Sequence, residues 1–221
     1  MSTIAIIDYG MGNLHSIAKA VEKVAEGARV LVSSDPDTIL AADRVVFPGV
    51  GGIGHTMEEL SRTGLGEVAR QAAVGKPMLC ICVGMQALFE HSEENNGTDC
   101  LGLVKGEVKR FAENLTSDDG QRLKVPHMGW NQVHQSAHPL WKGIPQDSRF
   151  YFVHSYYTVP ADSQLCAATT NYGADFCCAL ARENLFAVQF HPEKSQKAGL
   201  ALLGNVSRCD GRADAYESCM T

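Results

Sequence analysis

The chain has 221 residues, 45% of them hydrophobic and 20% charged, a length that suits one substantial core and roughly one or two domains. Its formal net charge of -6 at pH 7, without a cluster of Lys and Arg, excludes the concentrated positive charge that nucleic-acid binding requires. The sequence contains no run of about 18 apolar residues, so we expect no nucleic-acid partner and no insertion into a membrane.

The first half of the chain alternates short apolar runs with amphipathic segments. The apolar runs are rich in Ile and Val and nearly unbroken, as expected of strands that are covered on both faces of a sheet. The predicted strands are residues 3–8, 28–32, 44–48 and 77–81. The predicted helices between and after them are residues 14–25, 57–61, 65–73 and 85–91. This βαβ alternation predicts a mostly parallel central sheet with right-handed crossovers, flanked by helices.

The second half consists of strand-like pieces separated by turn residues, which predicts meandering, partly antiparallel additions to the same sheet. These pieces are residues 106–111, 131–135, 148–159, 165–171, 175–181 and 185–190. No linker interrupts them, so we expect a single α/β domain over residues 1–207. Residues 208–221 lack helical periodicity and are expected to form a loosely ordered C-terminal tail.

The N-terminal segment and the cysteines bear on the cellular compartment. The segment MSTIAIIDYG enters an apolar strand without a basic region or a cleavage site, which predicts a cytoplasmic protein without a secretory signal. In a reducing compartment we expect the eight cysteines to be free thiols. Because no CxxC pair is present, we expect no metal site, and no motif indicates a cofactor.

Two cysteines lie close together in PMLCICVGMQ, residues 77–86, where a predicted strand runs into a predicted helix. A nucleophile is commonly placed on such a sharp turn, with small residues two positions before and after it. Cys82 has Gly84 two positions later and lies at the expected helix start, where backbone N–H groups favour a thiolate. Cys80 lies inside the strand, where a cysteine usually serves as a small apolar residue. Cys82 is therefore the predicted nucleophile.

A histidine and a carboxylate end a later strand, in AVQFHPEKS at residues 187–195. Successive side chains alternate in an extended chain, so His191 and Glu193 project to the same side. Pro192 also biases the residue before it toward the extended conformation. A lone histidine is more often a structural residue, but here Glu193 can orient the imidazole toward a nucleophile such as Cys82.

Several motifs together resemble a known family. PMLCICVGMQ and FAVQFHPEKS are similar to the nucleophile and His-Pro-Glu segments of the class I glutamine amidotransferases, whose fold is flavodoxin-like. Four further motifs narrow the resemblance to one branch of this family, the glutaminase subunits of imidazole glycerol phosphate synthase. These motifs are IIDYGMGNLHS, PGVG, VPHMGWN and YFVHSYY. The resemblance covers residues 4–203. It implies an enzyme of histidine biosynthesis that hydrolyses glutamine to glutamate and ammonia through a cysteinyl thioester.

The resemblance also implies roles for individual residues. Cys82 is expected to be the nucleophile, His191 the general base and acid, and Glu193 the residue that orients the histidine. The residues expected to contact the substrate glutamine are Gly51, Gln86, His154 and Ser155.

The tetrahedral intermediates of this reaction need two hydrogen-bond donors for their oxyanion. One is expected to be the backbone N–H of Val83, and the other lies in the PGVGG loop, at Val50 or Gly51. Without the predicted nucleophile turn at Cys82, the PGVGG loop would be interpreted as a plain glycine-rich turn.

A glutaminase of this kind is expected to need a partner, because ammonia released into water is protonated and lost. By resemblance the partner is the (β/α)₈ cyclase subunit of the synthase, in a heterodimer. The DYGMGN segment lacks the GxGxxG spacing of a nucleotide loop and is more typical of an interface loop. A core position is an equally good interpretation for Met128 and Trp130. The residues placed at the interface are Asn13, Met128, Trp130, Asn131 and Lys194.

Two other functions stay open from the residues alone. The first is a different cysteine hydrolase with the same strand-to-helix turn at its nucleophile. Such an enzyme would act without a partner and without preference for glutamine. The second is a catalytically weakened binding module of the same fold, since the family usually has glycine where Cys80 stands. The presence of Cys82, His191 and Glu193 argues against the binding module.

Overall fold

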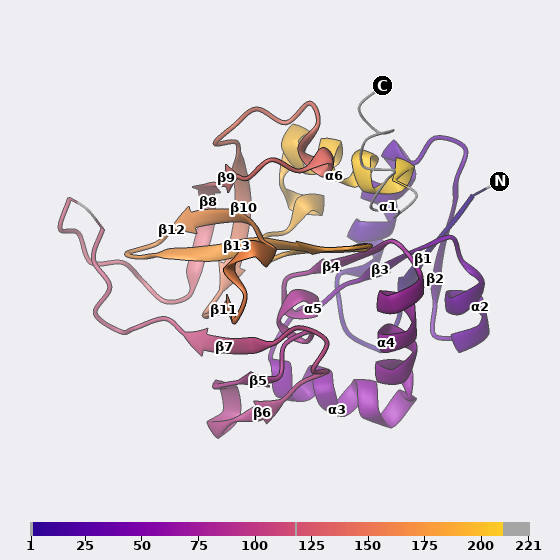
Figure 1. The fold of residues 1–221 in the computed structure, drawn as a ribbon, viewed down its shortest axis with the longest axis horizontal. Helices are drawn as coiled ribbons and strands as arrows, with labels where there is room; N and C mark the ends of the chain where they lie inside the picture. The colour runs from indigo at the N-terminus through magenta and orange to yellow at the C-terminus, as the bar shows by residue number, and fades with distance from the viewer. Residues whose placement is uncertain (1, 118, 210–221) are drawn as a thin grey trace.

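A mixed β-sheet forms the centre of the molecule and separates two layers of helices (Figure 1). The computed structural model describes residues 2–117 and 119–209. Helices α1 (Leu14–Val24) and α6 (Gln196–Arg208) pack together on one face of the sheet. The helices on the other face are α2 (Pro36–Ala41), α3 (Ile53–Thr63) and α4 (Leu65–Gly75). None of the described helices has the length and apolar character needed to cross a membrane.

Parallel strands make up the first part of the sheet, in the order β2-β1-β3-β4-β14. Both β4 and β14 are buried along their whole length, as apolar strands covered on two faces should be. They come from distant parts of the chain, yet they pair in parallel with Ile81 opposite Val188. The bounds of these strands are β1 (Thr3–Ile7), β2 (Arg29–Ser33), β3 (Arg44–Phe47), β4 (Met78–Ile81) and β14 (Leu185–Val188).

The second part of the sheet is largely antiparallel and continues from β14 through β13 (Asp175–Arg182), β11 (Tyr156–Pro160) and β7 (Gly106–Arg110). Shorter strands extend this part: β5 (His91–Ser92), β6 (Thr98–Asp99), β9 (His134–Gln135) and β12 (Cys166–Asn171). The predicted α/β fold, a single domain with flanking helices and antiparallel additions, is confirmed.

Two strands of the described part of the chain do not join the main sheet, which corrects the prediction that all strands of the second half belong to it. β8 (His127–Gln132) and β10 (Arg149–His154) pair with each other in a separate two-stranded sheet. The strand predicted at residues 148–159 is broken at Ser155, where the chain leaves β10 and enters β11 in the main sheet. β10 alternates buried with more exposed side chains, as a strand with one covered face does. A continuous strand would have forced both parts into one sheet.

The prediction of a helix at residues 85–91 is wrong, because α5 is a single turn, Val83–Gln86. The carbonyl groups that would continue the helix instead accept hydrogen bonds from a later loop. The acceptors are the carbonyls of Ala87, Leu88 and Phe89, and the donors are the N–H groups of Leu101, Gly102, Leu103 and Val104. The chain after the elbow therefore bends into β5, and Cys82 does not experience the macrodipole of a long helix.

Helix α2 was not assigned from the sequence, although its start signal is present. The carboxylate of Asp35 accepts a hydrogen bond from the N–H of Thr38 at 3.0 Å, and Pro36 occupies the first helical position. An Asp cap followed by Pro is a common helix start. The helix is short, so its periodicity is too weak to mark it.

Helix α6 covers the beginning of the predicted tail. Arg208 is its last residue and Cys209 is buried, whereas residues 210–221 lie outside the described residues. Short 3₁₀ turns in the described residues are η1 (Glu94–Asn96), η2 (Pro139–Trp141), η3 (Ser163–Leu165) and η4 (Pro192–Lys194).

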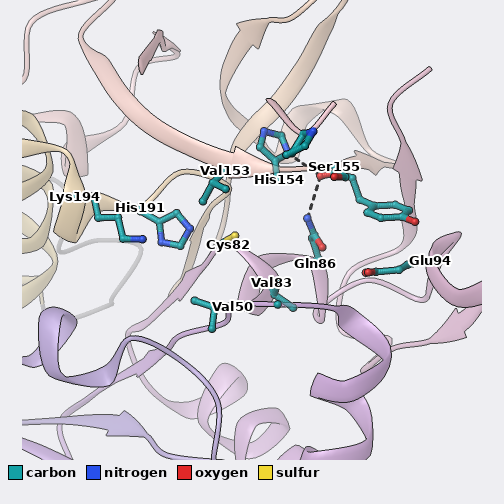
Figure 2. A pocket seen from close by; sticks show the side chains of 13 residues that line it. Val50, Cys82, Val83, Gln86, Glu94, Val153, His154, Ser155, His191 and Lys194 are labelled. Atoms are coloured by element: carbon teal, nitrogen blue, oxygen red, sulfur yellow. Dashed lines mark hydrogen bonds between the residues drawn. The ribbon is translucent and has the colours of Figure 1, made fainter. Parts of the chain in front are cut away.

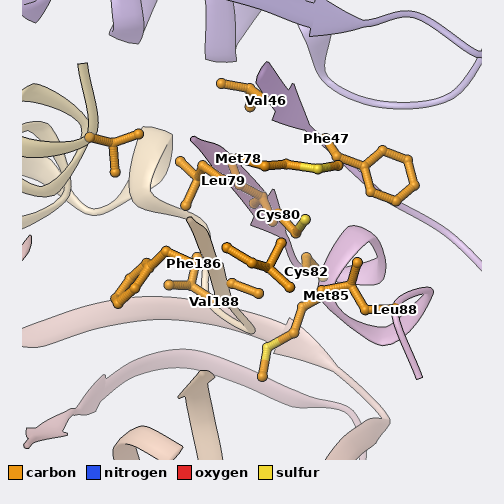
Figure 3. Packing of buried hydrophobic residues seen from close by; sticks show 14 of the residues in the cluster. Val46, Phe47, Met78, Leu79, Cys80, Cys82, Met85, Leu88, Phe186 and Val188 are labelled. Carbon is orange, nitrogen blue, oxygen red and sulfur yellow. The ribbon is translucent and has the colours of Figure 1, made fainter. Parts of the chain in front are cut away.

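Figure 3 shows the part of the core that surrounds β4. Leu79 and Cys80 of β4 are fully buried and belong to the same hydrophobic cluster as Phe47 of β3 and Phe186 of β14. Full burial of a Leu or Phe side chain contributes about 1.5–3 kcal/mol through the hydrophobic effect. This packed layer therefore holds the end of β4, and with it Cys82, in a fixed position.

Candidate active site

Cys82 lies directly after β4, on a sharp turn. Its backbone has φ 55° and ψ -112°, a combination that is unusual for a residue with a side chain. The N–H of Cys82 donates to the carbonyl of Val188 on the neighbouring strand at 2.7 Å, and this bond helps to hold the turn. The structure thus has the strained strand-to-helix turn of a nucleophile elbow at this position.

Two glycines allow the elbow and the loop after β3 to come into contact. A Cβ atom on Gly84 would lie 2.3 Å from the carbonyl oxygen of Phe47. A Cβ atom on Gly49 would lie 2.3 Å from the backbone nitrogen of Gly84. Glycine is therefore required at positions 49 and 84 because the backbones of the loop and the elbow approach closely. Gly51 is required for another reason, since its φ of 83° is a left-handed backbone conformation.

His191 follows β14, and because β14 pairs with β4 the histidine lies beside Cys82. The N–H of His191 donates to the carbonyl of Tyr151 at 2.9 Å, and its carbonyl accepts from the Ser195 hydroxyl at 2.6 Å. Nδ1 lies 2.9 Å from Oε1 of Glu193, and both side chains are almost fully buried. The other side of the imidazole faces Cys82 (Figure 2).

The electrostatic environment of His191 favours its charged form. Burial alone lowers the pKa of His191, but its hydrogen bonds to Cys82 and Glu193 and their negative charges outweigh burial and raise the pKa to about 10. The imidazole is therefore protonated at neutral pH. An imidazolium beside a sulfur stabilises a thiolate, which is the nucleophilic form of cysteine.

Cys80 has a different environment from Cys82. It is 0% exposed, and burial raises the pKa of the Cys80 thiol well above its usual value. Cys82 lines a cavity, whereas the Cys80 side chain packs in the core beside β3 (Figure 3). Geometry therefore supports Cys82 as the nucleophile and Cys80 as a small apolar residue.

A cavity of about 370 Å³ lies next to Cys82 and His191 (Figure 2). It is lined by the loop after β3, by the elbow and by the junction of β10 and β11. Every residue predicted for oxyanion stabilisation or substrate contact is in the lining: Val50, Gly51, Val83, Gln86, His154 and Ser155. Segments that are far apart in the sequence thus meet around the cavity that Cys82 lines.

Backbone donors for an oxyanion are available on two of these segments. Val83 is the first residue of α5, so its N–H has no carbonyl partner within that turn. The N–H of Met85, by contrast, donates to the carbonyl of Cys82 at 2.9 Å. Val50 and Gly51 border the cavity from the opposite loop. Which of these two supplies the second donor stays a prediction.

The side chain of Gln86 is held in one orientation by the protein. Its Nε2 donates to the carbonyl oxygen of Tyr156 at 3.0 Å (Figure 2). The same nitrogen donates to Oε1 of Gln189 at 3.1 Å. A backbone carbonyl can only accept, so the nitrogen of Gln86 must point toward it. Both amide hydrogens are engaged, and the amide oxygen is the atom left for a ligand.

His154 is a buried wall residue in a chain of hydrogen bonds. Its Nδ1 donates to the carbonyl of Tyr156 at 2.7 Å, and its Nε2 accepts from Nδ1 of His127 at 2.9 Å. Nε2 of His127 in turn accepts from the amide of Asn131 at 3.2 Å. Burial lowers the pKa of His154 to about 3 and that of His127 to about 4. Both rings are neutral at pH 7 and act as hydrogen-bonding groups.

Two residues of the site were missed by sequence analysis. Glu94 lines the cavity, and its Oε2 accepts a hydrogen bond from the N–H of Ile53 at 2.9 Å. It lies in a polar loop without a local signal, and only the folding of that loop brings it to the cavity. Gln189 contacts Cys82, with 3.7 Å between Nε2 and Sγ. Strand alternation does not predict this contact, because β14 ends at Val188 and the chain bends at Gln189 and Phe190.

Met128 and Trp130 are surface residues, 63% and 42% exposed on the outer face of β8. Their register partners on β10 are Val153 and Tyr151, both half-buried. These four residues form an apolar patch that we call the β8–β10 face. Exposed apolar patches of this kind mark interaction sites.

The other predicted interface residues occupy different positions. Lys194 and Val153 both line the cavity, and Nζ of Lys194 lies 6.0 Å from the centre of the Tyr151 ring, so the β8–β10 face borders the cavity. Asn131 points away from this face, because its amide donates to His127 and to the carbonyl of Asn171 at 2.8 Å. Asn13 immediately precedes α1, in the loop after β1.

A protein-family model described as Glutamine amidotransferase class-I matches residues 5–206. The match spans nearly the whole chain, and the chain belongs to this family of enzymes.

Curated relatives that the chain matches carry the name Imidazole glycerol phosphate synthase subunit HisH. The relative from Methylococcus capsulatus is 61% identical over 94% of this chain and 97% of its own length. The one from Nitrosococcus oceani is 58% identical over 96% of this chain and 99% of its own length. A relative from Pseudomonas aeruginosa, subunit HisH 1, is 56% identical with the same coverage, 96% and 99%. These identities make the chain a glutamine amidotransferase of the HisH type.

Solved structures show the same fold at low identity. A glutamine amidotransferase superposes with a TM-score of 0.68 at 13% identity, covering 92% of this chain and 98% of that one. A glutamine amidotransferase from Thermotoga maritima has a TM-score of 0.56 at 14% identity, covering 99% of this chain and 94% of that one. At such identities the likeness concerns the fold alone.

Proposed function

We propose that Cys82, His191 and Glu193 hydrolyse glutamine to glutamate and ammonia, and that the ammonia serves imidazole glycerol phosphate synthesis in histidine biosynthesis. The observation that carries this proposal is the position of His191, between Cys82 on the elbow and the buried carboxylate of Glu193. The names of the HisH relatives support the same reaction and pathway.

The geometry suits a two-step acyl transfer. The Cys82 thiolate attacks the side-chain amide carbon of glutamine, and the protonated His191 gives its proton to the departing nitrogen, which leaves as ammonia. The neutral imidazole then takes a proton from water, and the resulting hydroxide attacks the thioester. Cleavage of the carbon–sulfur bond releases glutamate and restores the thiolate and the imidazolium. Glu193 keeps Nδ1 engaged throughout, so that the other ring nitrogen faces the reaction.

The cavity is also suited to the charged end of glutamine. Glu94 lies on the side of the cavity away from His191 (Figure 2). A carboxylate there complements the α-ammonium group of a substrate whose amide carbon lies at Cys82. The free oxygen of Gln86 is a second acceptor on the same wall. We therefore assign recognition of the α-ammonium group to Glu94 and Gln86.

We further propose that the chain forms a heterodimer with a cyclase subunit, which docks on the β8–β10 face. This face borders the cavity through Val153 and Lys194, so a partner seated there would cover the cavity. Covering the cavity would allow ammonia to pass to the partner without being protonated in water. Asn13 and Asn131 stay proposed contacts in the surrounding region.

A cytoplasmic location is part of the same proposal. Cys80, Cys82, Cys100 and Cys166 are free thiols in the structure, which agrees with a reducing compartment.

The test is the release of ammonia from glutamine by the wild-type chain and by Cys82→Ala, each alone and with the cyclase subunit. The wild type should release ammonia when the partner is present, and Cys82→Ala should release none. His191→Ala should lower the rate by about 10²–10⁴. Hydrolysis of unrelated amides without a partner would favour a different cysteine hydrolase. Binding of the cyclase without hydrolysis under any condition would favour a binding module.

A further inference from the structure

We propose that Gln189 is a further catalytic residue, whose side-chain amide donates a hydrogen bond to the Cys82 thiolate. The distance from Nε2 of Gln189 to Sγ of Cys82 is 3.7 Å, within the range of a hydrogen bond to sulfur. Gln189 is fully buried. The proposal rests on Cys82 being the nucleophile, as set out under Proposed function.

The sheet itself places Gln189 beside the sulfur. Ile81 and Val188 are register partners in β4 and β14, so the next residues along each strand, Cys82 and Gln189, also lie side by side. The N–H of Gln189 donates to the carbonyl of Cys178 on β13 at 2.9 Å. The backbone of Gln189 is thus tied to a neighbouring strand at the point where its side chain reaches the elbow.

A chain of hydrogen bonds determines which end of the Gln189 amide faces the sulfur. The carbonyl of Tyr156 can only accept, so it fixes the nitrogen of Gln86 toward itself, at 3.0 Å. The second hydrogen of that nitrogen goes to Oε1 of Gln189 at 3.1 Å. With its oxygen engaged in this way, Gln189 presents its NH₂ group to Cys82. Gln86 therefore positions the donor, in addition to any contact with substrate.

This donor gives the sulfur of Cys82 a second hydrogen-bonding partner besides His191. His191 supplies a charge and a proton to the sulfur. A buried amide cannot lose its proton at neutral pH, so it stabilises the thiolate before attack and after thioester cleavage without taking part in proton transfer. Two donors on one sulfur also restrict the rotation of the Cys82 side chain.

The test is the alkylation rate of Cys82 by iodoacetamide, measured on the full chain without glutamine by peptide mass spectrometry. Gln189→Met has a similar length but no donor, and it should slow alkylation at pH 7 by about tenfold or more, because hydrogen bonds to charged groups are the strong ones. Gln189→Glu keeps the shape and the oxygen that Gln86 contacts, but it places a carboxylate at the sulfur. Its alkylation at pH 7 should be slower still.

Gln135→Met is the matched control, since Gln135 is also a buried glutamine, with its amide bonded to the carbonyl of Pro145 at 3.1 Å. It should alkylate at the wild-type rate. In glutamine hydrolysis, Gln189→Met should lower kcat and leave KM nearly unchanged. Alkylation of a folded Gln189→Glu or Gln189→Met chain at the wild-type rate would overturn the proposal. Because alkylation needs no glutamine, this outcome is distinct from a failure of the proposed glutaminase activity.

Discussion

The backbone N–H of Cys82 donates to the carbonyl of Val188 at 2.7 Å, which joins the turn that carries Cys82 to the strand that leads to His191. Both residues stand at the C-terminal ends of paired parallel strands, the usual place for a binding site in an open α/β sheet. The relative position of Cys82 and His191 is therefore set by strand pairing rather than by flexible loops.

The two neighbouring cysteines should differ sharply in function. We expect Cys82→Ala to abolish glutamine hydrolysis and Cys80→Ala to retain it, because only Cys82 lines the cavity. Ammonia release measures the first effect. Labelling by an electrophilic glutamine analogue, followed by peptide mass spectrometry, should find the label on Cys82, and preferential labelling of Cys80 would refute the assignment.

The elbow should not tolerate a side chain at Gly84. The added Cβ of Gly84→Ala would lie 2.3 Å from the backbone carbonyl oxygen of Phe47, so we expect the free energy of unfolding to fall by about 1–3 kcal/mol, with loss of hydrolysis. Gly75→Ala is the matched control. Nothing lies within 4 Å of its added Cβ, and Ala favours a helix over Gly by about 1 kcal/mol. Urea unfolding compares the two variants, and equal stability would show that the elbow can relax.

Stability should depend on pH through the buried, neutral His127. Its pKa is about 4 in the folded chain and near 6.5 when unfolded, so the unfolded state binds the extra proton between these values. Its contribution to stability is complete above pH 6.5 and is lost as the pH falls toward 4. His127→Gln should therefore reduce the slope of the unfolding free energy against pH in this window by up to about 1.4 kcal/mol per pH unit.

The control for this pH effect is Thr158→Val, which removes a buried hydroxyl that donates to the carbonyl of Cys177 at 3.1 Å. It should lower stability without changing the slope, because no titrating group is lost. Urea unfolding at several pH values between 4.5 and 6.5 gives both slopes. An unchanged slope in His127→Gln would mean that this ring does not stay neutral in the folded chain.

The β8–β10 face should be needed for partner binding. Met128→Asp places a charge on the most exposed apolar residue of this face, so we expect the Kd for the cyclase subunit to rise by about 30-fold or more, as for the loss of an interface hot spot. Val74→Asp is the control, since Val74 is 75% exposed on α4, away from the face. Titration calorimetry measures both. Equal affinity for the two variants would place the interface elsewhere.

The sequence by itself determined the elements whose signals are local. Unbroken apolar runs marked β1 to β4, and the glycine after Cys82 marked the turn. The pairing of His191 with Glu193 was predicted from alternation in an extended chain, but Glu193 lies in the 3₁₀ turn η4, and this turn brings its carboxylate to Nδ1 of His191.

Only the tertiary structure decided which of these elements lie together. The pairing of β4 with β14 brings Cys82 to His191, although more than half of the helices and strands in the described residues lie between these two strands. The single turn of α5, the separate β8–β10 sheet and the entry of Glu94 into the cavity likewise depend on distant hydrogen bonds and packing. A local pattern indicates whether a segment buries one face or two, but it does not indicate which other part of the chain covers the buried face. That choice is made by the free energy of the whole packed core, so it appears only when the chain has folded.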